Sequence, residues 1–159
     1  MSSSNEKNNL VFRPIGIVHT EVEDKNIGIS RKTNVKSIEI FNEYAQALNG
    51  IEEYSNIFVL FWMTKNNHKR ELTIYPRGNI DNKKVGSLAY RGRNHPNPIG
   101  LAVCDLIERR GNILKVLKLD AYNGTIIIDI KPYDDYDIVL DPSTPSWFKK
   151  NKSRGKKLN

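Results

Sequence analysis

The chain has 159 residues and a mass of 18.3 kDa, a size that fits one domain with a single core and excludes a multidomain assembly. Its 25 Lys and Arg against 18 Asp and Glu give a net charge of +7, which indicates an anionic partner. One cysteine excludes an internal disulfide, three scattered histidines argue against a metal site, and the longest apolar run, residues 57–63, is too short to span a membrane.

The charge is concentrated at one end of the chain. Residues 149–159 hold six cations and no acid, so residues 1–148 carry 19 basic against 18 acidic side chains. Residues 1–9 and 149–159 are polar with almost no apolar anchors, which predicts two flexible arms around one compact domain of residues 10–148. The polar start does not resemble a signal peptide, so we expect a cytoplasmic protein.

In the first half of the chain, β-rich runs predict strands over Ile15–Thr20 and Ser37–Phe41. The continuous apolar run Ile57–Met63 predicts a strand buried on both faces. One helix is expected over Glu43–Leu48, with Asn42 as its cap and Gly50 as a left-handed residue after its end.

The second half begins with a long polar loop and continues as a strand meander. The turn signals are Gly111-Asn112 and Asn123-Gly124, the second typical of a type I′ hairpin. The predicted loop is 65–84, and the predicted strands are Val85–Tyr90, Ile99–Ile107, Ile113–Leu119 and Thr125–Ile130. About seven short strands and one helix predict a mostly β protein, either an antiparallel barrel or a sandwich.

The stretch from Arg91 to Gly100 combines rigidity with hydrogen-bond donors. Two prolines and two glycines shape it, and two arginines, asparagines and His95 supply polar groups, which suits a polar or anionic ligand. The same composition also suits a solvated surface turn, and both interpretations stay open.

Residues 65–93 contain eight basic residues and two acidic ones, with tyrosines between them. This pattern fits a loop that binds RNA, and it equally fits a loop that is basic only for solubility.

Two further features carry polar groups near apolar strands. Asp120-Ala121-Tyr122-Asn123-Gly124 forms one cluster. Asp129 interrupts an isoleucine run, where a carboxylate needs a partner such as Lys131; a structural role for both acids is the alternative. Cys104 is expected to be a small buried hydrophobe, and no Rossmann or Walker motif occurs.

Five blocks of the sequence resemble, in order and spacing, the TsaA-like (TrmO) family. They are Pro14-Ile15-Gly16-Ile17-Val18-His19-Thr20, residues 47–55, Leu60-Phe61-Trp62, Arg91 with His95-Pro96-Asn97-Pro98-Ile99-Gly100-Leu101, and Asp129-Ile130-Lys131-Pro132-Tyr133. The resemblance implies a single-sheeted antiparallel β-barrel that works as a homodimer. It also implies S-adenosylmethionine-dependent methylation of the exocyclic nitrogen of a threonylcarbamoyl-modified adenosine beside the tRNA anticodon.

The resemblance also implies residue roles. The cofactor positions map onto Ser30, Arg31, Lys32, Met63, Thr64, Arg91, Leu101, Asp120, Ala121, Tyr122 and Asn123. Arg91 is expected to meet the methionine carboxylate, and Asp120 or the backbone that follows it is expected to hold the nucleoside. Asn97 or His95 is expected to orient the attacked base. The family usually has other residues at Ser30-Arg31-Lys32, Met63-Thr64, Gly92 and His95.

Two rival functions remain at this stage. The first is a non-catalytic RNA-binding barrel. The departure of Met63-Thr64 from the residues usual in the family favours it, and the unchanged Asn97-Pro98-Ile99-Gly100 motif argues against it. A methyltransferase with a different, small acceptor would be distinguished by turnover without RNA.

Overall fold

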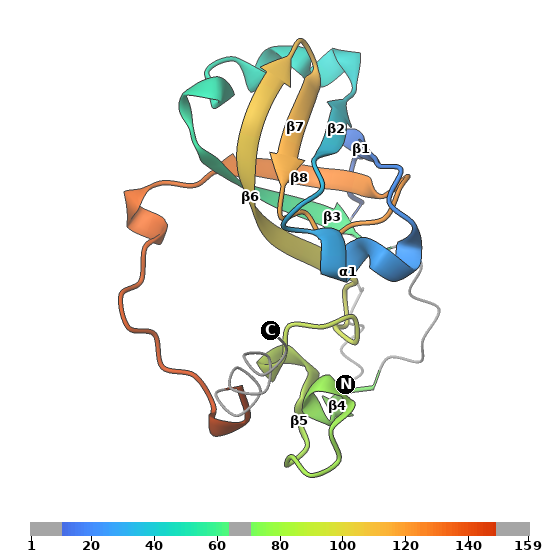
Figure 1. Cartoon of the computed structure of the whole chain (residues 1–159), viewed down its shortest axis with the longest axis vertical. Coiled ribbons are helices and arrows are strands. Elements are labelled where there is room, and N and C mark those ends of the chain that lie inside the picture. The colour runs from blue at the N-terminus through green and yellow to red at the C-terminus, as the bar shows by residue number, and fades with distance from the viewer. Residues whose placement is uncertain (1–10, 64–70, 149–159) are drawn as a thin grey trace, which may run out of the picture.

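The computed structural model describes residues 11–63 and 71–148, and a closed six-stranded barrel dominates it (Figure 1). The barrel strands are β1 (Gly16–His19), β2 (Lys36–Ile40), β3 (Asn56–Trp62), β6 (Ile99–Arg110), β7 (Ile113–Leu117) and β8 (Ile126–Pro132). Their order around the barrel is β1-β2-β7-β6-β3-β8, and every neighbouring pair is antiparallel. The predicted mostly β, single-sheeted barrel is therefore confirmed.

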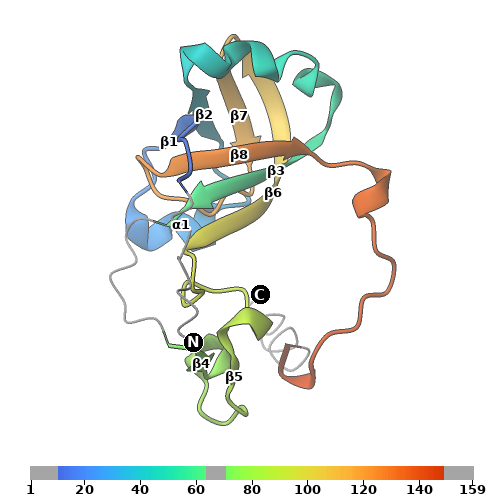
Figure 2. The ribbon, with the colours of Figure 1, turned by 180° about the vertical axis from the view of Figure 1, so that it is seen from behind.

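A second, two-stranded sheet lies apart from the barrel, formed by β4 (Thr73–Ile74) and β5 (Val85–Gly86) (Figures 1 and 2). The segment after β8 runs from the barrel to this small sheet, where the rings of Trp147 and Tyr90 lie 6.1 Å apart. The helical elements whose bounds lie within the described residues are short: η1 (Asp24–Asn26), α1 (Ile27–Ser30), η2 (Asn42–Leu48), η3 (Ile51–Glu53), η4 (Pro76–Gly78), η5 (Ser87–Ala89) and η6 (Asp135–Asp137).

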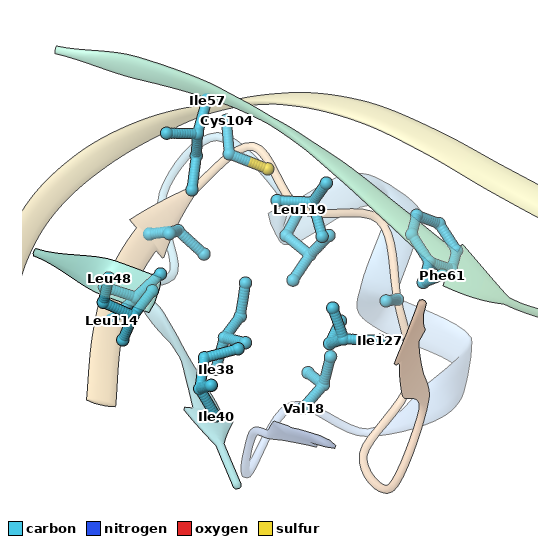
Figure 3. Packing of buried hydrophobic residues seen from close by; sticks show 13 residues of the cluster. Val18, Ile38, Ile40, Leu48, Ile57, Phe61, Cys104, Leu114, Leu119 and Ile127 are labelled. Atoms are coloured by element: carbon cyan, nitrogen blue, oxygen red, sulfur yellow. The ribbon is translucent and has the colours of Figure 1, made fainter. Parts of the chain in front are cut away.

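The core fills the inside of the barrel, because alternate residues of each strand point inward (Figure 3). Aliphatic side chains from all six strands meet there, together with Cys104, which is fully buried as predicted. The predicted strand buried on both faces is wrong for β3. Ile57, Val59 and Phe61 are buried, whereas the alternate residues of β3 are only half-buried on the outer wall.

The predicted helix exists in a tighter form. Residues Asn42–Leu48 form a 3₁₀ helix that follows Phe41, and no side-chain hydrogen bond caps its start, so Asn42 is not its cap. Gly50 has a φ of 88°, as its left-handed role requires. Two turns of 3₁₀ helix suffice here because the segment only bridges β2 and β3 over the barrel end.

Two strand predictions need correction. Strand β5 ends at Gly86, and η5 follows it, so Val85–Tyr90 is only partly extended. Asn123-Gly124 is not a type I′ hairpin turn, since only Gly124 has positive φ and β8 pairs with β1 and β3 rather than with β7. Turn residues report local backbone preference, whereas barrel closure decides which strands pair.

Candidate functional site

A cavity of about 190 Å³ opens between the end of β3 and the connection from β7 to β8. Residues from three distant parts of the chain line it: Phe61, Met63, Arg93, Asp120, Ala121, Tyr122 and Thr125. Four of these, Met63 and Asp120 to Tyr122, are cofactor positions expected from the sequence. The barrel thus brings together two of the predicted cofactor segments, although 57 residues separate Met63 from Asp120.

The first wall of the cavity is fixed by the loop before β6. The backbone N–H of Met63 donates to the carbonyl of Pro98 at 2.8 Å, so β3 is extended by one bond beyond Trp62. This bond gives the Asn97-Pro98-Ile99-Gly100 block a structural role, because it connects the loop before β6 to the end of β3. Thr64, the next predicted cofactor position, lies outside the described residues.

The second wall belongs to the connection from β7 to β8. We call residues 119–122 of this connection the 119–122 loop; Asp120, Ala121 and Tyr122 line the cavity. Leu119 and Ala121 are buried and anchor it, whereas Asp120 and Tyr122 are exposed. Lys118, at a φ of 68°, turns the chain into this loop, and its N–H donates to the Arg31 carbonyl at 2.7 Å. That bond places the predicted segment Ser30–Lys32 beside the start of the loop, although none of its residues lines the cavity.

Asn123 belongs to a different part of the surface. Its Oδ1 accepts a hydrogen bond from the Thr20 N–H at 3.0 Å, and it lines a separate open hollow of about 580 Å³ beside His19 and Glu21. The structure therefore separates Asn123 from Asp120, Ala121 and Tyr122, with which the sequence grouped it.

Arg91 and Leu101 are brought together, but at the barrel's outer wall. The Arg91 guanidinium donates to the Leu101 carbonyl at 2.8 Å, and the Leu101 side chain is 48% exposed. Neither residue lines the 190 Å³ cavity, whereas Arg93, two positions further along the same loop, does.

His95 and Asn97 stabilise their own loop. The His95 Nε2 is 2.7 Å from the Tyr90 carbonyl, and the Asn97 carbonyl accepts a hydrogen bond from the Ile99 N–H at 2.8 Å. The His95 side chain is partly buried, Asn97 is exposed, and neither lines the cavity. Their catalytic role stays a prediction.

Three cavity residues, Phe61, Arg93 and Thr125, were not among the site residues predicted from the sequence. Phe61 and Arg93 fall within predicted segments, but nothing in the sequence indicated that their side chains border the cavity. Thr125 carries no signal in the sequence beyond its place after the Asn123-Gly124 turn.

Charges of opposite sign border the cavity, Arg93 and Asp120. Beneath the 119–122 loop, burial lowers the pKa of Lys36, and the negative charge of Asp120 opposes that shift.

The predicted partner of Asp129 is confirmed, because the Lys131 ammonium lies 2.9 Å from the Asp129 carboxylate. Both side chains are half-exposed and lie away from the cavity, which favours a structural role for this pair.

Within the part of the chain that the structure describes, no cluster of three or more His, Cys, Asp or Glu side chains could hold a metal ion. Over the same residues, no helix has the length and apolar character needed to cross a membrane.

Comparison with known proteins decides the family. Residues 19–137 match the domain described as the tRNA-methyltransferase O N-terminal domain. The chain belongs to the TrmO family. The predicted family is therefore confirmed, and with it, at the level of the family, a tRNA methyltransferase that uses S-adenosylmethionine.

Several relatives of this TrmO-family chain carry informative names. It is 35% identical over 146 residues to a probable S-adenosyl-L-methionine-binding protein of Pyrococcus abyssi, a match that covers 89% of this chain and 78% of that protein. It is 31% identical over 151 residues to a tRNA (adenine(37)-N6)-methyltransferase of Rattus norvegicus, covering 87% of this chain and 35% of the rat protein. The chain thus spans about a third of the rat enzyme's length.

Solved structures support the fold. The crystal structure of TrmO from Pseudomonas aeruginosa superposes with a TM-score of 0.69 at 21% identity, covering 89% of this chain and 64% of that one. A second TrmO crystal structure gives a TM-score of 0.70, also at 21% identity, and covers 94% of this chain and 76% of that one.

Proposed function

We propose that this chain binds S-adenosylmethionine at the 190 Å³ cavity and methylates the exocyclic nitrogen of a threonylcarbamoyl-modified adenosine beside the tRNA anticodon. The observation that carries the proposal is the meeting of Met63 with Asp120, Ala121 and Tyr122 at one cavity of a TrmO-family barrel. The chain has no glycine-rich Rossmann motif, and a site assembled from separate segments of the barrel is an alternative way to bind this cofactor.

The chemistry of the cavity residues fits the cofactor. Phe61, Met63 and Ala121 offer an apolar surface, and Tyr122 adds a ring on which an adenine can stack. Arg93, two positions after Arg91 on the same loop, adds positive charge beside the cavity, and Asp120 offers an acceptor for ribose hydroxyls or an ammonium group. The bound cofactor would supply an electrophilic methyl group on a sulfonium centre.

The protein's task is then mainly to position the reactants. A nitrogen that attacks a methyl group in line gains much of its rate from being held in attack geometry, and one proton must leave it. Buried Phe61 and half-buried Met63 keep water away from the inner end of the cavity. Arg91 is proposed to meet the methionine carboxylate, and Asn97 or His95 to orient the base.

We also propose a homodimer. A cavity of about 190 Å³ is smaller than the roughly 300–1,000 Å³ of typical ligand pockets, so the described residues of one chain enclose only part of a cofactor site. The outer wall of β3 and β6 offers an apolar surface for a second copy: Leu101 and Val103 are 48% and 40% exposed, opposite half-buried Leu60 and Phe58. Arg91 bonds to the carbonyl of Leu101, so this surface lies next to a predicted cofactor residue.

The proposed RNA contacts come from basic segments. The six cations of residues 149–159 lie outside the described residues, and the chain enters them from Phe148, whose ring lies 5.6 Å from the Arg77 guanidinium of η4. A single-stranded anticodon loop presents its modified base without the cost of opening a duplex.

The test combines calorimetry with S-adenosylmethionine and S-adenosylhomocysteine and methyl transfer to tRNA that carries or lacks the threonylcarbamoyl group. Binding of both ligands and transfer only to the modified tRNA would support the proposal. RNA binding without cofactor binding would favour a non-catalytic RNA-binding barrel, and turnover without RNA would favour a different acceptor.

A further inference from the structure

Lys36 is a charged residue in the barrel core. It begins β2 at an inward position, in phase with Ile38 and Ile40, and is only 1% exposed. Its ammonium donates to the carbonyl of Leu119 at 2.7 Å and to the carbonyl of Ala121 at 3.3 Å. The first carbonyl belongs to the peptide unit between Leu119 and Asp120, and the second to the unit between Ala121 and Tyr122, so one side chain holds two peptide units that adjoin cavity residues.

The cost of this arrangement indicates a purpose beyond stability. Burial disfavours a charged ammonium, which is why the pKa of Lys36 is lowered even though the charge of Asp120 opposes the shift. The hydrogen-bond partners of the ammonium are neutral backbone carbonyls, which offset this cost less than a carboxylate would. Every other inward residue of β2 is an isoleucine, so the core itself has no need of a lysine here.

We propose that Lys36 is a positioning residue for the 119–122 loop: its ammonium holds the carbonyls of Leu119 and Ala121 so that Asp120 and Tyr122 keep their places at the cavity. The inference rests on the proposed cofactor site. Leu119 and Ala121 are themselves buried, whereas Asp120 and Tyr122 are exposed. The ammonium therefore acts on the buried side of the loop, and its effect reaches the ligand through the backbone.

The test uses the full chain with two variants. Lys36→Met keeps an unbranched apolar stem without the ammonium, and Lys36→Gln keeps a neutral donor on a shorter side chain. The control is Ile57→Val, a mild core truncation on β3 at the end opposite Phe61. Three readings are compared: S-adenosylmethionine affinity by calorimetry, the urea midpoint, and amide hydrogen exchange of residues 119–122 without ligand.

For Lys36→Met we expect affinity about tenfold weaker, and exchange in the 119–122 loop faster than in Ile57→Val. Lys36→Gln should fall between Lys36→Met and the unaltered protein, and Ile57→Val should bind normally. Unchanged affinity and exchange in Lys36→Met would overturn the proposal. So would a loss of stability without any change in the loop.

If Lys36→Met fails to fold, the same readings on Lys36→Gln decide: weaker affinity and faster exchange support the positioning role, and normal values overturn it. The exchange reading needs no ligand, so it separates this proposal from the proposed function. Faster exchange in a protein that binds no S-adenosylmethionine would contradict the cofactor site and still support the hold of Lys36 on the loop.

Discussion

Gly100 on β6 lies directly opposite Phe61 on β3, and the Phe61 ring occupies the space that a Cβ atom at Gly100 would need. The ring reaches this place because the last residue of the Asn97-Pro98-Ile99-Gly100 block has no side chain. Phe61 is then buried and forms one wall of the cavity. The motif thus shapes the candidate site through a close packing contact rather than through a polar group.

This contact predicts the effect of Gly100→Ala. The added methyl group must displace the Phe61 ring, so we expect a loss of about 1–3 kcal/mol in the free energy of unfolding and weaker cofactor binding. Urea denaturation and calorimetry measure the two effects. Gly86→Ala is the matched control, since a Cβ there meets no atom closer than 4.0 Å. Normal cofactor affinity in a folded Gly100→Ala variant would contradict the role of Phe61 at the site.

Arg91→Ala tests the predicted carboxylate contact. We expect affinity for S-adenosylmethionine to fall several-fold to a hundredfold, because a charge-assisted hydrogen bond contributes on the order of 1.5–3 kcal/mol. The melting temperature should barely change, since the Arg91 side chain is exposed. Arg110→Ala, an exposed arginine at the far end of β6 paired with Glu108, should bind normally. An unaltered dissociation constant for Arg91→Ala would remove Arg91 from the site.

Much of the fold could be predicted from local sequence patterns, because strand periodicity and turn residues act over short distances. The strands at Gly16–His19, Lys36–Ile40 and Asn56–Trp62 were expected within a few residues of their bounds. Pairing was not predictable in the same way, since the ladder between β1 and β8 joins residues more than 100 positions apart. The candidate site follows this division. Met63 and residues 120–122 were expected at the site, whereas the contact of Lys36 with the Leu119 carbonyl joins residues 83 positions apart and could not be predicted from local patterns.

Cys104 predicts a specific pH dependence. Burial raises the pKa of its thiol to about 12, so the folded protein keeps a proton that the unfolded chain releases near pH 9. This group therefore contributes stability that is full below about pH 9 and is lost as the pH rises toward 12, at up to about 1.4 kcal/mol per pH unit.

Lys36 has the opposite effect over part of this pH range. Because the pKa of Lys36 is lowered in the folded protein, its contribution to stability rises with pH up to 10.5, the pKa of lysine in the unfolded chain. The difference between the unaltered protein and Cys104→Ala isolates the thiol. Urea denaturation between pH 8 and 11 should show a steeper decline for the unaltered protein. Parallel declines would contradict the raised pKa.

The proposed dimer predicts a mass of about twice 18.3 kDa by light scattering at micromolar concentration. Val103→Asp places a charge on the outer wall of β3 and β6 and should yield monomers with weaker cofactor binding. Ile80→Asp, at an exposed position in the segment between β4 and β5, should remain dimeric. A monomer that binds the cofactor normally would refute a site shared between subunits.

The basic regions predict two different effects on RNA. Deleting residues 149–159 should weaken tRNA binding and its dependence on salt. The slope of log affinity against log salt concentration should become shallower by about 0.7 per lost phosphate contact, so by at most about 4 for six cations. Cofactor affinity should stay the same. Charge reversal at Lys69, Arg70 and Arg77 should instead lower turnover on the correct tRNA; Lys69 and Arg70 lie outside the described residues. Unchanged affinity and salt slope after tail deletion would make the tail a solubilising extension.

The most direct test of the proposed function is methyl transfer from isotope-labelled S-adenosylmethionine to tRNA, measured in parallel on tRNA with and without the threonylcarbamoyl group. We expect label on the exocyclic nitrogen of the modified adenosine and none on the unmodified tRNA. Below saturating cofactor, transfer should be slower with Arg91→Ala than with Arg110→Ala. Equal labelling of both tRNAs, or no labelling by a protein that binds both tRNA and cofactor, would contradict it.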